Sequence, residues 1–288
     1  MGSSAKKKSA PVASRIARWR WWFQGGFLLV WLDPFLLRLH RVCSPVFHCY
    51  SCPLATFACP IGVLANFSAW HVIPFLPLGV LFVVGSLFGS FVCGWACPLG
   101  FLQDLLDKIP TPKFRLPNWV GCFRYLTLIG LVVAVPYFYG ESHALFFCRV
   151  CPAGALEAAV PNTVQTAIAG KAVWPTAAKI VILVTILASA LFTWRPWCRI
   201  FCPLGAIYSL FDPVSVFFLR FRRGDCIECK DCRGACRDLA DPEFSVDGMR
   251  CVRCLECTNC RAIAVQSVFS HSAKLPEKAL VGLENPKK

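Results

Sequence analysis

The chain has 288 residues, of which 56% are hydrophobic and 16% are charged, and its formal net charge is +14. This composition is too apolar for an ordinary soluble domain of this length, and it favours an integral membrane protein. The basic residues gather in short segments beside apolar stretches, which is typical of membrane topology and argues against nucleic-acid binding.

Four apolar stretches are each close to the roughly 20 residues that a helix needs to cross a bilayer. We expect membrane spans at residues 21–39, 72–92, 119–139 and 174–194; buried helices of a soluble core are the alternative. Basic residues precede the first span and follow the fourth, so the positive-inside rule places both termini in the cytoplasm. The sequence thus predicts a multi-pass protein of the cytoplasmic (inner) membrane. Residues 1–20 would be a basic cytoplasmic segment, and residues 21–215 the membrane domain.

Two ionisable residues in this apolar region are candidates for a quinone or proton site. Asp33 lies within the first expected span, where a charged residue suggests a functional role. His71 lies beside Trp70 at the edge of the second expected span. The other interpretations are that Asp33 caps a half-helix begun by Pro34 and that His71 is an interfacial residue. No catalytic residue is assigned.

An internal repeat organises the apolar region. Residues 93–100 and 198–205 both read C-x3-C-P-L-G, and Cys59 and Cys151 each begin a related Cys-Pro-x-Gly sequence. Each half therefore reads span, Cys-Pro-x-Gly, span, Cys-Pro-x-Gly. The predicted fold class is an all-α integral membrane four-helix bundle with an internal two-fold repeat, followed by a small α+β ferredoxin-like cytoplasmic domain.

The proline of each repeat suits the first turn of a helix, because its missing N–H would be unpaired there. The preceding cysteine would then cap the helix. After Pro98, we expect an interfacial helix with an apolar face that includes Leu99, Leu102 and Leu105 and a polar face that includes Gln103 and Asp104.

Two halves related by a pseudo-two-fold axis would bring their cysteines together on each membrane face. The expected cytoplasmic-face site is a metal cluster held by Cys93, Cys97, Cys198 and Cys202; helix-capping cysteines without metal are the alternative. On the outer face the candidates are Cys49, Cys52, Cys59, Cys148 and Cys151, one of which is spare. Disulfides are the alternative there. Cys43 and Cys122 are left unassigned, and we expect Cys122 to be buried.

The C-terminal part carries two further cysteine runs, C-x2-C-x2-C-x3-C and C-x2-C-x2-C-x2-C. This pattern is typical of a two-cluster bacterial ferredoxin, in which the fourth cysteine of each run serves the other [4Fe-4S] cluster. The usual proline after the fourth cysteine is replaced by Arg237 in the first run and by Arg261 in the second. Bound zinc is the alternative to iron–sulfur clusters. We expect a ferredoxin domain over residues 216–265 and a tail over residues 266–288. The predicted ligand sets are Cys226, Cys229, Cys232 and Cys260, and Cys251, Cys254, Cys257 and Cys236.

The paired C-x3-C-P motifs and the C-terminal cysteine runs together resemble the membrane ferredoxins of the NapH and MauN type, over about residues 15–265. The resemblance implies an iron–sulfur subunit of a larger redox complex. It would pass electrons between a cytoplasmic donor or the quinone pool and an extracytoplasmic cytochrome or reductase. We expect two clusters in the ferredoxin domain and two more in the membrane domain, with a quinone as a further ligand. A metal-reducing assembly factor and a redox sensor are the other functions considered.

Overall fold

The computed structural model describes residues 12–31, 43–46, 49, 57–114, 117–168, 170, 177–227, 231–236, 251–260 and 262–271, and these are mostly helical. The helices are α1 (Val12–Trp31), α2 (Pro60–Ala69), α3 (Phe75–Phe88), α4 (Phe91–Trp95), α5 (Pro98–Leu106), α6 (Phe123–Leu126), α7 (Val135–Tyr139), α8 (Phe147–Val150), α9 (Val160–Ile168), α10 (Ala177–Phe192), α11 (Pro196–Ile200), α12 (Pro203–Phe211) and α13 (Asp231–Ala235). Two strands, β1 (Phe217–Phe221) and β2 (Ile263–Ser267), pair antiparallel with Phe217 opposite Ser267.

The prediction of a four-helix membrane bundle is wrong for the residues that the structure describes. One helical stretch among them, Trp119–Tyr139, is long and apolar enough to cross a membrane. It is a continuous run that passes from a 3₁₀ turn into α6, a π-helical segment (Thr127–Ala134) and α7. Within their described residues, the other three expected spans do not form apolar helices of sufficient length.

The physical reasons differ among these three stretches. α3 has 14 residues because it ends at Gly89, whose left-handed φ of 53° turns the chain before α4 begins. α10 has 16 residues and follows a segment outside the described part. α1 begins earlier than expected and buries two polar residues, Arg20 and Gln24, against the protein; residues 32–39 lie outside the described residues.

The caps expected at the cysteine–proline motifs are confirmed. Cys59, Cys97 and Cys202 are the N-cap residues of α2, α5 and α12, and each is followed by proline. The carbonyl of each cysteine accepts a hydrogen bond from the backbone N–H four residues later, at 3.0 to 3.1 Å. Cys151 makes the same contact with the N–H of Ala155, at 3.1 Å. All four motifs therefore begin a helix with the same local geometry.

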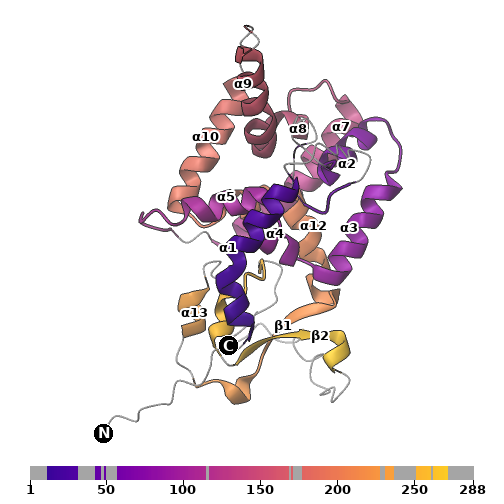
Figure 1. Cartoon of the computed structure of the whole chain (residues 1–288). Helices are drawn as coiled ribbons and strands as arrows, with labels where there is room; N and C mark the ends of the chain where they lie inside the picture. Colours follow the sequence, from indigo (N-terminus) through magenta and orange to yellow (C-terminus); the bar gives the residue numbers. More distant parts are fainter. Residues whose placement is uncertain are drawn as a thin grey trace.

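These elements follow one another along the length of the molecule (Figure 1). The sheet and α13 lie at one end, and α4, α5 and α12 lie in the middle. The helices α2, α7, α8 and α9 lie toward the other end. α1 packs against α5 and against the 3₁₀ turn Glu256–Asn259, so it joins the middle of the molecule to its C-terminal part.

The expectation for α5 is wrong for its polar face, which is buried together with Leu99. Gln103 and Asp104 are 1% and 0% exposed, whereas Leu105 is 48% exposed. Burying a charge is costly unless it is paired. The polar face of α5 points inward because arginine side chains from two distant segments meet Asp104 there.

Candidate metal centres

The two C-x3-C-P-L-G motifs bring four cysteines around one small cavity, which we call the repeat site. Cys93 lies in α4 and Cys198 in α11, while Cys97 and Cys202 cap α5 and α12. All four line a cavity of about 20 Å³, together with Arg124 from α6. The sequence prediction of this set therefore agrees with the spatial arrangement, although iron ligation itself stays a proposal.

The glycine of each motif permits close backbone packing. A Cβ added at Gly100 would lie 3.2 Å from the carbonyl oxygen of Cys93, and one at Gly205 would lie 3.2 Å from that of Cys198. The two halves thus repeat the same contact between the helix start and the first cysteine. Both loops fold tightly enough to turn their two cysteines toward the same cavity.

The repeat site fits an all-sulfur cluster ligand set. Burial raises the pKa of Cys97 to about 12, with Cys198 adding to the rise. Burial and the neighbouring cysteines likewise raise the pKa of Cys93 and Cys202 well above the usual thiol value. Four bare thiolates would therefore be unstable here, whereas bound iron would supply the positive charge that lets the cysteines ionise.

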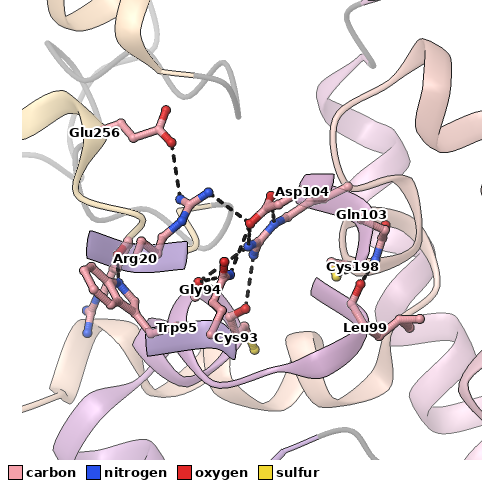
Figure 2. A network of polar contacts seen from close by, with 12 residues as sticks. Arg20, Cys93, Gly94, Trp95, Leu99, Gln103, Asp104, Cys198 and Glu256 are labelled. Atoms are coloured by element: carbon pink, nitrogen blue, oxygen red, sulfur yellow. Dashed lines mark hydrogen bonds and ion pairs between the residues drawn. The ribbon is translucent and has the colours of Figure 1, made fainter. Parts of the chain in front are cut away.

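A buried network of charges braces this site (Figure 2). Arg195, at the start of α11, donates from Nε to Oδ1 of Asp104 at 2.9 Å and from Nη1 to the carbonyl of Cys93 at 3.1 Å. Arg20 donates to the same carboxylate at 2.9 Å and lies 3.4 Å from Glu256. Gln24 donates to Asp104 at 3.1 Å. The network therefore links α1, both repeat halves and the C-terminal part.

The pKa of Asp104 is lowered despite its burial. Desolvation opposes ionisation of the carboxyl, but the charge and hydrogen bonds of Arg195, followed by Arg20 and Gln24, outweigh it. The carboxylate is thus a fixed negative charge that holds both arginines in place. Arg195 has a left-handed backbone with φ of 46°, an uncommon conformation for a non-glycine residue that the surrounding contacts sustain.

Gln103 makes a direct contact with a predicted ligand. Its Nε2 donates to Sγ of Cys198 at 3.3 Å and to the carbonyl of Leu99 at 3.2 Å, while its Oε1 accepts from the N–H of Trp197 at 3.2 Å (Figure 2). The backbone N–H of Gly205 donates to Sγ of Cys202 at 3.4 Å. Hydrogen bonds to sulfur are among the factors that set a cluster potential.

A second group of cysteines surrounds a larger cavity, which we call the second site. Cys49, Cys59, Cys148 and Cys151 line a cavity of about 490 Å³, together with residues that include Asn66, Trp70 and Lys179. A Cβ at Gly62 would lie 3.5 Å from Sγ of Cys148, and one at Gly154 would lie 3.6 Å from Sγ of Cys49. Each half thus contacts a cysteine of the other half. Cys52, the remaining candidate, lies outside the described residues.

Charged groups also flank the second site. Burial raises the pKa of Cys148 to about 11, with Cys49 adding to the rise and Lys179 opposing it. Glu157 accepts a hydrogen bond from the N–H of Cys49 at 2.7 Å. It lies in a π-helical turn (Gly154–Ala159), a feature often found at functional sites. Its charge also contributes to the raised pKa of Cys97 in the repeat site, after burial and Cys198.

The C-terminal segment (residues 226–260) folds its two cysteine runs against each other. α13, from the first run, packs on the turn Glu256–Asn259 of the second. Burial raises the pKa of Cys257 to about 12, and Cys254, Cys236 and Cys232 add to the rise. Cys232 and Cys236 of the first run both act on Cys257 of the second run, and the predicted crossover of the fourth cysteines stays a prediction. Seven of the eight predicted ligands lie in the described part, and Cys229 lies outside it.

No group of three or more His, Cys, Asp or Glu side chains within the described ranges is suited to hold a single metal ion. A zinc ion holds its ligands about 2.0–2.3 Å away, so its cysteines must converge on one point. The cysteines of the repeat site and the second site instead line cavities.

Of the two candidates for quinone or proton chemistry, His71 is among the described residues, and it lines neither of these cavities. Asp33 lies outside the described residues. His71 is exposed, and its ring lies 4.3 Å from that of Tyr137.

Some residues fall outside the sequence expectations. Cys43 is buried, and its pKa is raised to about 12 by burial and by nearby Cys59. Cys122 is exposed, contrary to expectation, because it lies in a surface 3₁₀ turn. The buried partners Arg195, Asp104 and Gln103 were not assigned to any site. The one sequence feature that could have indicated this network is the presence of charged residues, Asp104 and Arg195, in largely apolar stretches of the sequence.

Comparisons with known proteins agree with the cysteine motifs. A 4Fe-4S binding domain family matches residues 70–117 and 177–224, and each segment contains one C-x3-C-P-L-G motif. An uncharacterised protein of Methanocaldococcus jannaschii is 30% identical over 249 residues, which are 81% of this chain and 94% of that protein. No solved structure matches.

Two relatives belong by name to the NapH and MauN type that the cysteine motifs resemble. The ferredoxin-type protein NapH of Haemophilus influenzae is 25% identical over 236 residues, which are 76% of this chain and 77% of that protein. The methylamine utilization ferredoxin-type protein MauN of Methylorubrum extorquens is 28% identical over 190 residues, which are 64% of this chain and 57% of that protein. The resemblance is therefore confirmed.

Proposed function

We propose that this chain, which belongs to the ferredoxin-type family that includes NapH and MauN, relays electrons through iron–sulfur clusters along three groups of cysteines. The observation that carries the proposal is the position of the repeat site. Cysteines of the repeat site and of the second site belong to one buried core, and Cys251 of the C-terminal segment lines the repeat cavity. The three groups are thus contiguous, as a relay requires.

The proposed ligands are the cysteines that these groups contain. The repeat site and the second site would each hold one [4Fe-4S] cluster with four cysteines, and the C-terminal segment would hold two. A cluster of this type accepts and releases one electron without making or breaking a bond to substrate. The contribution of the chain is to hold the sites at fixed separations and to exclude water. Buried Arg124 and Arg195 supply positive charge beside the repeat site.

The second site is the proposed exchange point with an external redox partner. Its cavity is far larger than that of the repeat site, and it has a lysine at its edge. We propose that a cytochrome or reductase outside the cytoplasm meets the chain here. The C-terminal segment would exchange electrons with a cytoplasmic donor or the quinone pool. The apolar slab of a bilayer is about 30 Å thick, and cysteines buried in a shared core shorten the distance an electron must travel across it.

We further propose that the chain works at the cytoplasmic membrane. The stretch Trp119–Tyr139 has the length and hydropathy of a crossing helix. Large apolar side chains are exposed elsewhere as well, including Phe75 on α3 and Ile168 on α9. Such exposed apolar surface is unfavourable in water and fits contact with lipid or with another subunit.

Iron and acid-labile sulfide analysis of anaerobically purified protein tests the proposal. Four clusters predict about 16 iron atoms per chain, and clusters confined to the C-terminal segment predict about eight. Replacement of a repeat-site ligand, Cys198→Ser, should remove about four iron atoms and one electron paramagnetic resonance (EPR) signal. The matched control is Cys122→Ser, because Cys122 is exposed and outside all three groups. Equal iron content in the two variants would refute a cluster at the repeat site.

A further inference from the structure

The loop that joins Cys251 to Cys254 lies directly on the helix that carries Cys93. A Cβ added at Gly94 would lie 2.4 Å from the carbonyl oxygen of Val252, which is shorter than any normal contact. The indole Nε1 of Trp95 donates to the carbonyl of Arg253 at 3.1 Å. Glycine at position 94 is therefore required by the approach of this loop, and the loop backbone is held against α4.

Arg253 anchors the same loop from inside the protein. Its side chain is 0% exposed, and its backbone has a left-handed φ of 48°. Nη1 donates to three oxygen atoms of the repeat half, those of the Phe88 carbonyl at 3.1 Å, the Ser215 hydroxyl at 2.7 Å and the Phe217 carbonyl at 2.6 Å. Nη2 donates to the Asp212 carbonyl at 2.8 Å. A buried guanidinium with this many acceptors fixes both position and orientation.

The residues that accept hydrogen bonds from Arg253 are themselves held in place by further contacts. The carboxylate of Asp212 lies 3.4 Å from Arg253 and accepts hydrogen bonds from the N–H and the hydroxyl of Ser90, at 2.8 and 2.6 Å. Ser90 precedes Cys93 by three residues. A Cβ at Gly89 would lie 2.5 Å from this carboxylate, and the φ of Gly89 is 53°. The turn before Cys93 is thus shaped around the arginine of the cysteine loop.

The contact selects one of the two C-terminal cysteine sets. Cys251 and Val252 line the repeat cavity beside Cys93, Cys97, Cys198 and Cys202. The backbone N–H of Arg253 donates to Sγ of Cys251 at 3.4 Å. Arg253 and Leu255, which flank Cys254, both have left-handed φ angles. Strained non-glycine residues persist where surrounding contacts hold them, and they often mark functional positions.

We infer that Arg253 is a positioning residue that makes the set of Cys251, Cys254, Cys257 and Cys236 the direct electron-exchange partner of the repeat site. The set that begins at Cys226 would then be the distal one. Exchange between the two adjacent sites is a one-electron step, in which one cluster is oxidised as the other is reduced and no proton or bond is transferred. The inference rests on the proposed function and adds an order to it.

Removal of one set at a time tests the order. In reduced full-length protein, spin–spin interaction should broaden the EPR signal of the repeat-site cluster. Cys254→Ser should abolish that broadening, and Cys226→Ser should leave it in place. The opposite result, or equal broadening in the two variants, would overturn the inference. Absence of iron at the repeat site would instead overturn the proposed function, so the two failures are distinguishable by iron content.

The docking contact can be tested with the clusters retained. Gly94→Ala should push the loop away from α4, weaken the broadening and slow electron equilibration between the two sites. Gly224→Ala is the matched control, since nothing lies within 4 Å of a Cβ at that position. Arg253→Ala should have the same effect as Gly94→Ala, with exposed Arg223→Ala as its control. Unchanged coupling and unchanged rates in both docking variants, at full iron content, would contradict the inference.

Discussion

The repeat site and the second site are built from the same Cys-Pro-x-Gly unit, but they are enclosed differently. The repeat cavity measures about 20 Å³, and the second cavity about 490 Å³. Ion pairs of fully buried residues brace the repeat site, whereas aromatic side chains and Lys179 line the second site. A relay point inside the molecule benefits from a rigid, water-free site. A terminal point needs access for a partner, so one local motif serves two roles.

The largest effect that tests this difference between the sites is expected from removing the negative charge of Asp104, which braces the repeat site. Asp104→Asn leaves Arg195 and Arg20 buried without their carboxylate, and breaking a buried pair costs about 3–5 kcal/mol. We expect a large fall in the free energy of unfolding, measured by thermal or denaturant unfolding in detergent. The control is Asp107→Asn, whose partner Lys113 lies 3.0 Å away and is partly exposed, so that water weakens their pairing relative to the fully buried pairs of Asp104. Equal losses in the two variants would show that the network does not brace the site.

The difference in enclosure also predicts an order of iron loss. A chelator should remove iron from the second site before it removes iron from the repeat site, because the larger cavity admits the reagent. The time course of iron release from wild type, Cys148→Ser and Cys198→Ser assigns each phase to a site. We expect Cys148→Ser to lack the fast phase and Cys198→Ser to lack a slow one. A fast phase that disappears in Cys198→Ser would reverse the comparison.

A smaller effect is expected from the hydrogen bond to sulfur at the repeat site. The Nε2–H of Gln103 stabilises the more negative, reduced form of a cluster held by Cys198, so Gln103→Leu should lower the midpoint potential. A hydrogen bond to a charged group contributes about 1.5–3 kcal/mol. If about 1 kcal/mol of this differs between the two oxidation states, the potential shifts by about 40 mV for one electron. An EPR-monitored redox titration gives the shift.

Tyr208 provides the matched control for this prediction. It occupies the position in the second repeat that Gln103 occupies in the first, but its hydroxyl donates to the carbonyl of Pro45. Tyr208→Phe should therefore leave the potential unchanged. A shift in Tyr208→Phe that equals the shift in Gln103→Leu would mean that packing, and not the bond to sulfur, sets the potential.

The smallest effect is expected at Glu157, which contacts Cys49 of the second site and whose charge also acts on Cys97 of the repeat site. Glu157→Gln removes a negative charge while the side chain can still accept the hydrogen bond from Cys49. Both cluster potentials should rise slightly, because the reduced clusters gain a less negative environment. Parallel redox titrations of wild type and variant measure the change. A shift in the midpoint potential of one cluster alone would show that the charge of Glu157 acts on that site and not on the other.

Local features of this protein were predictable from the sequence because their causes are local. Proline at the first helical position and cysteine at the cap follow from the missing N–H, and they are found at Cys97 and Cys202. The repeated motif spacing grouped the four cysteines that line the repeat cavity, and their role as ligands stays a prediction.

The remaining features depend on contacts between distant segments. Hydropathy predicted a continuous span through Gly89, where the docking of Arg253 and Asp212 instead requires a turn. The amphipathic pattern of α5 predicted that Asp104 is exposed. Asp104 is instead buried, because Arg20 and Arg195 contact it from positions 84 and 91 residues away in the sequence. Sequence alone therefore determined the ligand motifs and helix starts. Only the tertiary structure decided which polar groups are buried and where helices end, because those choices depend on partners that no local pattern contains.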